Sequence, residues 1–343
     1  MKIYLTADFQ DEDGTLKFQD IGLSVLEADE RIQFHFFDAH KSEIGSDQLG
    51  DAEGVIVLTP SVTRKTLDSA SRLLAIGRFG VGYDAVDVQA CTDSDVLLYI
   101  TAGAVDRSVA EATVGWMIAL THHLRTKDIL VREGRWDDRS HYMGGELRDR
   151  TLGVIGLGGI AKATIDLLGA FGMNQPLAFD PFSTPEAAAE VGVRLVDLPE
   201  LLAESDFLSI HCPLTDQTRG LLGATELAKM KQGAFLINTA RGGIVDEDAL
   251  YRALEERHIA GAALDCFENE PVTQPHRFRF LPNVLLAPHS IAWTHELFRD
   301  IGRAACQGMV DLANGKRPRG CVNPEVFDRP GFHEKWSRLQ REV

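Results

Sequence analysis

The chain has 343 residues, 44% of them hydrophobic, and this length predicts two globular domains rather than one. Its formal net charge of −16, without a run rich in Lys or Arg, argues against a nucleic-acid partner, because the phosphate backbone would be repelled. No run approaches the roughly 18 apolar residues of a membrane span. The opening MKIYLTADFQ reaches Asp8 before a signal-type apolar core forms, so we expect a cytoplasmic protein without a membrane partner.

Short apolar runs alternate with helical patterns along the chain. The runs of the first hundred residues are IYLT, GVIVL, RLLAIG and VLLYI, and the later ones are TLGVIG, PLAFD, FLSIHC, AFLINTA, GAALDC and VLLAPH. Continuous apolar runs of this kind are typical of parallel strands that are buried on both faces. Their alternation with helices predicts a doubly wound α/β fold.

Other segments are predicted from their polarity. Residues 108–120 are apolar on nearly all faces after the first turn, so this helix should be buried on several sides, at a domain junction and as a candidate subunit contact. Residues 122–150 are polar with isolated aromatic side chains, as in an arm on a surface. A further helix is predicted for residues 293–314, and beyond Gly320 we expect an irregular tail.

The five cysteines are Cys91, Cys212, Cys266, Cys306 and Cys321. They are odd in number, scattered, and without a C-x-x-C pair, so the sequence predicts neither a disulfide framework nor a zinc site. We therefore expect reduced thiols and no metal.

Residues 151–161, TLGVIGLGGIA, have the pattern of a strand that leads into G-x-G-x-x-A and then into a helix. Gly156 would permit the tight turn, and Gly158 would let backbone amides approach a pyrophosphate. The small Ala161 would let the helix pack closely on the strand. A tight βα turn that binds no nucleotide has the same pattern, so the next strand has to decide between a nucleotide site and a simple turn.

That next strand, PLAFD, ends at Asp180, 24 positions after Gly156 (180 − 156). The spacing is close to the roughly twenty residues expected for a carboxylate that accepts from the adenosine ribose hydroxyls. Such a carboxylate would repel a 2′-phosphate, which favours NAD over NADP. In the alternatives, Asp180 merely begins the turn Asp-Pro-Phe-Ser, or the chain is a methyltransferase, which uses similar turns.

Three later predicted strands are followed by polar residues: Arg241 in NTARGGIVDE, Glu270 in ALDCFENEP and His289 in LAPHSIAWT. An open α/β sheet binds its ligand beyond the carboxyl ends of its strands, so all three could line one crevice. Taken singly, Arg241 could be a surface charge, Glu270 a turn residue, and His289 a core or capping histidine.

Taken together, the motifs resemble the D-isomer-specific 2-hydroxyacid dehydrogenase family over roughly residues 50–323. The resemblance rests on the order and spacing of RFGVGYDAVDV (78–88), SVAEAT (108–113), GLGGIA (156–161), HCPLTDQTRGLL (211–222), INTARGGIVDEDAL (237–250), ALDCFENEP (263–271) and APHSIAWT (287–294). Such an ordered series is far more specific than the glycine motif alone.

The resemblance implies catalytic roles for the three strand-end residues. Arg241 would bind the substrate carboxylate and polarise the oxygen on carbon 2, and His289 would be the general acid or base. Glu270 would hydrogen-bond the other imidazole nitrogen and favour the charged form, and it counts against a formate dehydrogenase, which pairs its histidine with Gln. Val81 and Gly82 match the loop whose backbone amides receive the carboxylate.

The resemblance also implies NAD as the cofactor, with Asp265 binding the nicotinamide carboxamide. The other expected cofactor-binding residues are Thr113, Gly156, Gly158, Gly159, Ile160, Asp180, His211, Thr239, Ala240 and His289. Gly159 stands where many relatives carry Arg or another larger side chain, so we expect one direct phosphate contact to be absent.

The family's organisation implies a Rossmann NAD-binding domain, residues 103–291, inserted into a flavodoxin-like substrate domain of residues 1–102 and 292–343. The substrate would bind in the cleft between them, and the NAD-binding domain would form a homodimer. The implied function is an NAD-dependent oxidoreductase that interconverts a small D-2-hydroxy acid and its 2-keto acid. A phosphite- or formate-type dehydrogenase and an NAD-sensing, corepressor-like binding protein are the alternatives, and the substrate and direction stay open.

Overall fold

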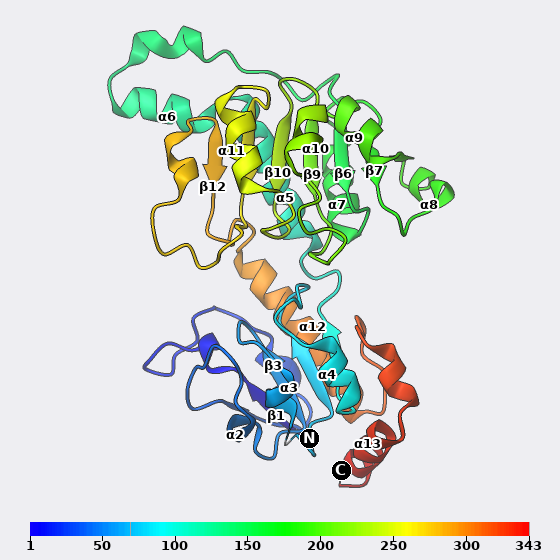
Figure 1. Ribbon diagram of the computed structural model, residues 1–343. Coiled ribbons are helices and arrows are strands. Elements are labelled where there is room, and N and C mark those ends of the chain that lie inside the picture. Colours follow the sequence, from blue (N-terminus) through cyan, green and yellow to red (C-terminus); the bar gives the residue numbers. More distant parts are fainter. Residues whose placement is uncertain (69, 343) are drawn as a thin grey trace. The chain divides into compact units, whose positions relative to one another are not determined.

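The computed structural model describes residues 1–68 and 70–342, and the chain divides into two compact units (Figure 1). Unit 1 combines Met1–Val105 with Trp293–Val343, and unit 2 is Asp106–Ala292. Each unit contains one parallel sheet with helices, so the predicted class of two parallel-sheet α/β domains is confirmed.

Unit 1 has a five-stranded parallel sheet in the order β2-β1-β3-β4-β5. Its strands are β1 (Lys2–Leu5), β2 (Gln33–Phe36), β3 (Gly54–Val57), β4 (Ala75–Arg78) and β5 (Leu97–Ile100). This is the flavodoxin-like order, in which the direction of winding reverses between β1 and β3. The four predicted apolar runs form β1, β3, β4 and β5, whereas the edge strand β2 was not predicted.

The helices of unit 1 come from both ends of the chain. They are α1 (Leu23–Glu27), α2 (Ser46–Leu49), α3 (Arg64–Leu67), α4 (Val88–Asp93), α12 (His295–Ala313) and α13 (Pro330–Glu342), with the 3-10 helices η1 (Ala7–Phe9) and η4 (Pro324–Asp328). The predicted helix 293–314 is therefore confirmed as α12. It begins after Thr294, whose side chain accepts from the Leu297 amide at 3.0 Å and caps the helix.

The prediction of an irregular tail beyond Gly320 is wrong, because the chain there forms η4 and α13. Phe332 and Trp336, one turn apart on α13, pack with Phe327 of η4. The Trp336 indole N–H also donates to the carbonyl of Leu312 in α12 at 2.9 Å. The spacing of these aromatic residues gives α13 an apolar face, which the polar composition of the segment concealed.

Unit 2 has a seven-stranded parallel sheet in the order β12-β11-β10-β9-β6-β7-β8. Its strands are β6 (Leu152–Ile155), β7 (Leu177–Phe179), β8 (Arg194–Leu195), β9 (Phe207–Ile210), β10 (Phe235–Asn238), β11 (Gly261–Leu264) and β12 (Val284–Leu286). The winding reverses between β6 and β9, which makes this a Rossmann-type sheet. A ligand crevice is therefore expected beyond the carboxyl ends of these two strands.

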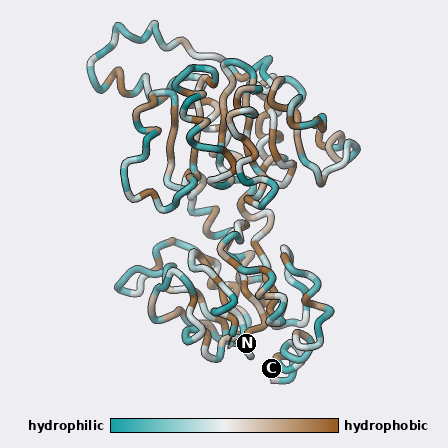
Figure 2. Tube along the Cα trace, viewed as in Figure 1, coloured by the Kyte–Doolittle hydropathy of each residue, from teal (hydrophilic) through white to brown (hydrophobic). Residues whose placement is uncertain are grey.

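Helices cover both faces of this sheet (Figure 1). They are α5 (Asp106–Thr121), α6 (Leu124–Arg132), α7 (Gly159–Leu168), α8 (Pro185–Ala189), α9 (Leu198–Glu204), α10 (Ala224–Lys229) and α11 (Glu247–Glu255), with the 3-10 helices η2 (Trp136–His141) and η3 (Arg277–Phe280). Successive residues of one strand face opposite layers: Leu236 of β10 packs in the cluster with α9, α10 and α11, and Ile237 in the cluster with α5 and α7. Figure 2 shows hydrophobic residues along these strands.

The segment that contains α6 and η2 extends away from the sheet of unit 2 (Figure 1). Its chain is polar, but Trp136 and Met143 expose 62% and 80% of their surface. This extension has the character of the predicted surface arm. Among the described residues, no helix combines the length and the apolar character that crossing a membrane would need.

Candidate active site

Three neighbouring strand ends bring the predicted catalytic side chains of unit 2 together. Arg241 follows β10, Glu270 follows β11 and His289 follows β12. Backbone bonds join these ends: the Asp265 amide donates to the Asn238 carbonyl at 3.0 Å, and the His289 amide donates to the Asp265 carbonyl at 2.8 Å. The parallel register thus places residues far apart in sequence at one edge of the sheet.

His289 and Glu270 form a hydrogen-bonded pair. Nδ1 of His289 lies 2.7 Å from Oε2 of Glu270, whose Oε1 accepts the Phe267 amide at 2.8 Å. Burial raises the pKa of the Glu270 carboxyl, but the bonds from His289 and Phe267 and the charges of His289 and Arg241 outweigh it, so this pKa is lowered overall. Because Glu270 engages Nδ1, Nε2 is the ring nitrogen that can exchange a proton with a ligand.

Asp265 holds the loop that carries His289. Its buried carboxylate accepts the amides of Ser290 at 2.8 Å and Ile291 at 3.1 Å. Burial raises the pKa of the Asp265 carboxyl, and the two amides only partly oppose this effect. His289 itself has a φ of 51°, which is left-handed backbone, so these bonds fix an unusual conformation at the candidate catalytic residue.

Asn238 shapes the loop that carries Arg241. Its Nδ2 donates to the Arg241 carbonyl at 2.8 Å, and its Oδ1 accepts the Ala240 amide at 3.0 Å. The half-buried Arg241 donates through Nη1 to the Ala240 carbonyl at 2.6 Å. Cys266 also donates to that carbonyl, at 3.3 Å. The sequence identified Cys266 only as a reduced thiol, but in the structure it shares the Ala240 carbonyl with Arg241 and lies close to the His289–Glu270 pair.

The glycine motif lies at the junction of β6 and α7. Gly156 has a φ of 88°, and a Cβ there would lie 3.1 Å from the Cys212 backbone nitrogen, so β6 and the end of β9 approach closely. Gly158 precedes the first residue of α7, and apart from its chain neighbours no described atom lies within 4 Å of a Cβ built there. The space beside Gly158, just before the helix N-terminus, is therefore open, as the approach of an anion there requires.

Asp106, the first residue of α5, lies directly against Gly159. A Cβ on Gly159 would fall 1.9 Å from Oδ2 of Asp106. Burial raises the pKa of the Asp106 carboxyl. Asp106 thus fills the space that a side chain at position 159 would need. No sequence motif had pointed to Asp106.

Comparison with known proteins identifies the family. Residues 114–290 match the family model described as "D-isomer specific 2-hydroxyacid dehydrogenase, NAD binding domain". The glyoxylate reductase of Korarchaeum cryptofilum is 33% identical over 325 residues, which cover 93% of this chain and 98% of that protein. The chain belongs to the D-isomer specific 2-hydroxyacid dehydrogenase family. The predicted family membership is therefore confirmed.

Other members of the family are similar over different shares of their length. The D-3-phosphoglycerate dehydrogenase of Archaeoglobus fulgidus is 39% identical over 281 residues, 82% of this chain. The chain spans about half of that relative, 53% of its length. The crystal structure of the D-lactate dehydrogenase from Aquifex aeolicus, complexed with NAD and lactic acid, has a TM-score of 0.80 at 26% identity and covers 93% of this chain and 98% of that one.

Two buried polar atoms that follow β9 and β10 fit a cofactor of the kind this family uses. Within the described residues, Nδ1 of His211 and Oγ1 of Thr239 have no hydrogen-bond partner. Nε2 of His211 lies 2.9 Å from Oγ of Ser209, and burial lowers the pKa of this histidine to about 4, so it is neutral at pH 7. Unsatisfied buried groups are costly, and a bound ligand would satisfy both.

Asp180 stands beside the glycine motif as predicted for the family, but its carboxylate already has partners. Oδ2 accepts the Leu157 amide at 2.8 Å, and Oδ1 accepts the Phe182 amide at 2.8 Å. Asp180 thus begins the turn Asp-Pro-Phe-Ser, which the sequence had offered as the alternative to a role in ribose binding. Each carboxylate oxygen has a second lone pair, so both can still accept from ribose hydroxyls.

The remaining predicted residues lie in three places. Thr113 is buried in α5 and donates to the Val109 carbonyl at 2.9 Å, and Ile160 lies in the first turn of α7. Val81 and Gly82 lie in unit 1, in the loop after β4. Just before them, the Gly80 carbonyl accepts the Thr101 amide at 3.0 Å, so this loop is fixed within its own unit.

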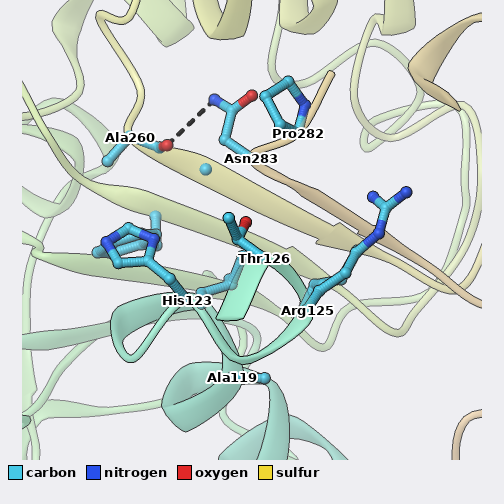
Figure 3. Close-up of a pocket in the computed structure, with 11 residues that line it drawn as sticks. Ala119, His123, Arg125, Thr126, Ala260, Pro282 and Asn283 are labelled. Carbon is cyan, nitrogen blue, oxygen red and sulfur yellow. Dashed lines mark hydrogen bonds between the residues drawn. The ribbon is translucent and has the colours of Figure 1, made fainter. Parts of the chain in front are cut away.

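Two pockets of unit 2 lie outside this set. The one in Figure 3 is lined by Ala119, His123, Arg125, Thr126, Ala260, Pro282 and Asn283, among others, at the amino ends of β10 to β12. Its position at the opposite ends of the strands separates it from the candidate site. The other pocket is open to solvent. Its lining includes Arg219 together with Gly242 and Gly243, the two residues that follow Arg241 in the sequence.

Proposed function

We propose that the chain is an NAD-dependent oxidoreductase that interconverts a small D-2-hydroxy acid and its 2-keto acid. The observation that carries this proposal is the 2.7 Å contact between His289 and Glu270 beside Arg241. Nε2 of His289 takes the hydroxyl proton in oxidation and returns it in reduction. Arg241 binds the substrate carboxylate and the oxygen on carbon 2 through its planar fork. When bound, the nicotinamide accepts or supplies the hydride.

The proposal assigns NAD binding to residues 103–291 and makes residues 1–102 and 292–343 the substrate domain, which adds the loop with Val81 and Gly82 to Arg241 and His289. The glycine motif, the neutral His211 and the open space beside Gly158 support the first assignment. The fixed loop with Val81 and Gly82, whose amides can receive a carboxylate, supports the second. The exposed aromatic and apolar side chains of the α6–η2 extension support a homodimer through the NAD-binding domain.

Turnover of small 2-keto acids tests the function directly. The purified chain is assayed with glyoxylate, hydroxypyruvate, pyruvate and bulkier 2-keto acids, each with NADH and with NADPH. Oxidation of NADH by at least one acid is expected. If NADH binds but no acid across the panel is reduced, the enzyme proposal is wrong and an NAD-sensing binding protein is favoured.

NADH should be preferred over NADPH by at least about tenfold in kcat/KM, which corresponds to ~1.4 kcal/mol of like-charge repulsion between Asp180 and the 2′-phosphate. Asp180→Asn should narrow this ratio, because the amide is uncharged. Asp216→Asn, in an exposed loop of the same unit, is the control and should leave the ratio unchanged. Equal kcat/KM for the two cofactors in the wild-type chain would contradict this role of Asp180.

Glu270→Gln should move the pH profiles of the two reaction directions. Since the fold lowers the pKa of the Glu270 carboxyl, the group is ionised at neutral pH, and its negative charge lies 2.7 Å from Nδ1 of His289. Gln removes that charge, so reduction, which needs protonated His289, should weaken at neutral pH and partly recover at lower pH. Oxidation, which needs neutral His289, should extend to lower pH.

The control for this experiment is Glu247→Gln, because Glu247 pairs with His276 at 3.2 Å elsewhere in unit 2. It should leave both profiles in place. Profiles of both directions are measured after circular dichroism has shown that each variant is folded. Two unmoved profiles in Glu270→Gln would show that Glu270 is not the electrostatic partner of His289.

A further inference from the structure

Cys266 joins the His289–Glu270 pair in a cluster of possible metal ligands. The Cys266 Sγ, a carboxylate oxygen of Glu270 and a ring nitrogen of His289 all lie within 4.8 Å of one another. Cys266 is buried with 3% of its surface exposed, whereas the side chains of Glu270 and His289 expose 32% and 44%. An ion can therefore reach the sulfur from the side of the two exposed ligands.

The fold, rather than a sequence motif, assembles this cluster. Cys266 comes two residues after the end of β11, and His289 comes three residues after the end of β12. The bond from the His289 amide to the Asp265 carbonyl joins these two strand ends beside Cys266. Glu270 folds back over the same point, because its Oε1 accepts the Phe267 amide. The absence of a C-x-x-C pair therefore says nothing about this site.

The chemistry of the three ligands selects the metal. A thiolate, an imidazole and a carboxylate form a typical zinc ligand set, whereas Mg²⁺ and Ca²⁺ prefer oxygen ligands throughout. Zinc bond lengths of about 2.0 to 2.3 Å place tetrahedral ligands roughly 3.3 to 3.8 Å apart. Side-chain movements of about 1 Å would thus close the cluster around an ion, with the fourth position left for water.

We propose that Cys266, Glu270 and His289 form a zinc-binding site whose occupation inhibits the enzyme reversibly. Binding replaces the Cys266 thiol proton, which passes to solvent, by a bond from the thiolate to Zn²⁺. The same ion takes a ring nitrogen of His289 and the Glu270 carboxylate. The histidine can then no longer exchange a proton with substrate. The metal binding stands by itself, and only the inhibition rests on the proposed function.

Cobalt titration tests the binding without any assay of turnover. The full chain, stripped of metal with a chelator, is titrated with Co²⁺ as a spectroscopic substitute for Zn²⁺ and then back-titrated with Zn²⁺. We expect one ion per chain, a thiolate-to-cobalt charge-transfer absorption, and loss of this absorption when Zn²⁺ displaces Co²⁺. A wild-type chain that binds Co²⁺ without a thiolate absorption would overturn the proposal, and so would one that binds no ion.

Variants assign the sulfur. Cys266→Ser should abolish the charge-transfer absorption and weaken Zn²⁺ binding by at least about tenfold. Cys266→Ala gives a second variant, in case Ser perturbs the fold. Cys321→Ser is the matched control, because this thiol also donates to a backbone carbonyl, at 3.1 Å, and is more exposed than Cys266. The Cys321→Ser variant should change neither the absorption nor the affinity for Zn²⁺. An absorption retained in both folded Cys266 variants, or lost in Cys321→Ser, would reject the site.

Inhibition is measured separately. Zn²⁺ should inhibit the wild-type chain, a chelator should restore activity, and Cys266→Ser should need at least about ten times more Zn²⁺. Equal inhibition of both chains would overturn the inhibitory role. If no 2-keto acid is turned over, the proposed function fails, and the cobalt spectra still decide whether the metal site exists.

Discussion

His289→Ala is expected to lower turnover by about two to four orders of magnitude, the usual contribution of a general acid or base. In the proposed mechanism the imidazole exchanges a proton with the oxygen on carbon 2, since its Nδ1 is held by Glu270 and 44% of its side chain is exposed. The affinity for NADH should stay nearly unchanged, because the glycine motif and Asp180 lie around other strands of unit 2. Steady-state rates and fluorescence titration with NADH measure the two effects.

His276→Ala is the matched control for this substitution. His276 also contacts a carboxylate, that of Glu247 at 3.2 Å, but it lies in the segment before η3. Its replacement should leave turnover close to that of the wild-type chain. If His289→Ala keeps more than half of the wild-type turnover, His289 is not the acid or base of the reaction.

Arg241→Lys should lower kcat/KM by about 10- to 100-fold although the charge is preserved. A lysine presents a point charge rather than a planar fork, so at least one charged hydrogen bond to the substrate, worth about 1.5 to 3 kcal/mol, is lost. The bond from Nη1 to the Ala240 carbonyl, which orients the guanidinium, would also be lost. Kinetics with saturating NADH measure the change.

Arg219→Lys provides the comparison, because Arg219 lies in the open pocket next to Gly242 and Gly243 rather than among the strand-end residues. It should change kcat/KM by less than about twofold, as expected for an exposed surface position. An unchanged kcat/KM in Arg241→Lys would show that Arg241 does not contact the substrate.

The sequence predicts the buried central strands of both units well, but it predicts the strands at the edges of the two sheets poorly. Central strands such as β6 and β9 are buried along their whole length, so their continuous apolar runs are visible in the sequence. The edge strand β2 alternates between exposed and half-buried residues, and β8 has only two residues, so neither leaves such a run. The helix α13 was missed because the polar composition of its segment conceals the apolar face, which packs with Phe327 of η4.

The candidate site follows a similar division. Arg241, Glu270 and His289 could be predicted because each follows a recognisable strand and stands in a motif of the family. Asp106 and Cys266 could not be identified in this way. The contact of Asp106 with Gly159 joins two helices, and the proximity of Cys266 to Glu270 and His289 depends on how β11 and β12 are paired. Such neighbours become visible only once the tertiary structure is formed.

If His289 is the proposed acid or base, its left-handed backbone sets stability against activity at this position. A φ of 51° costs a residue other than glycine about 1 kcal/mol or more, and the bonds to Asp265 offset this strain. Asn or Gly would tolerate the conformation better, but neither can serve as the acid or base. Directed evolution that selects only for thermal tolerance would therefore favour loss of the histidine, so any library built on this chain needs an activity screen at every round.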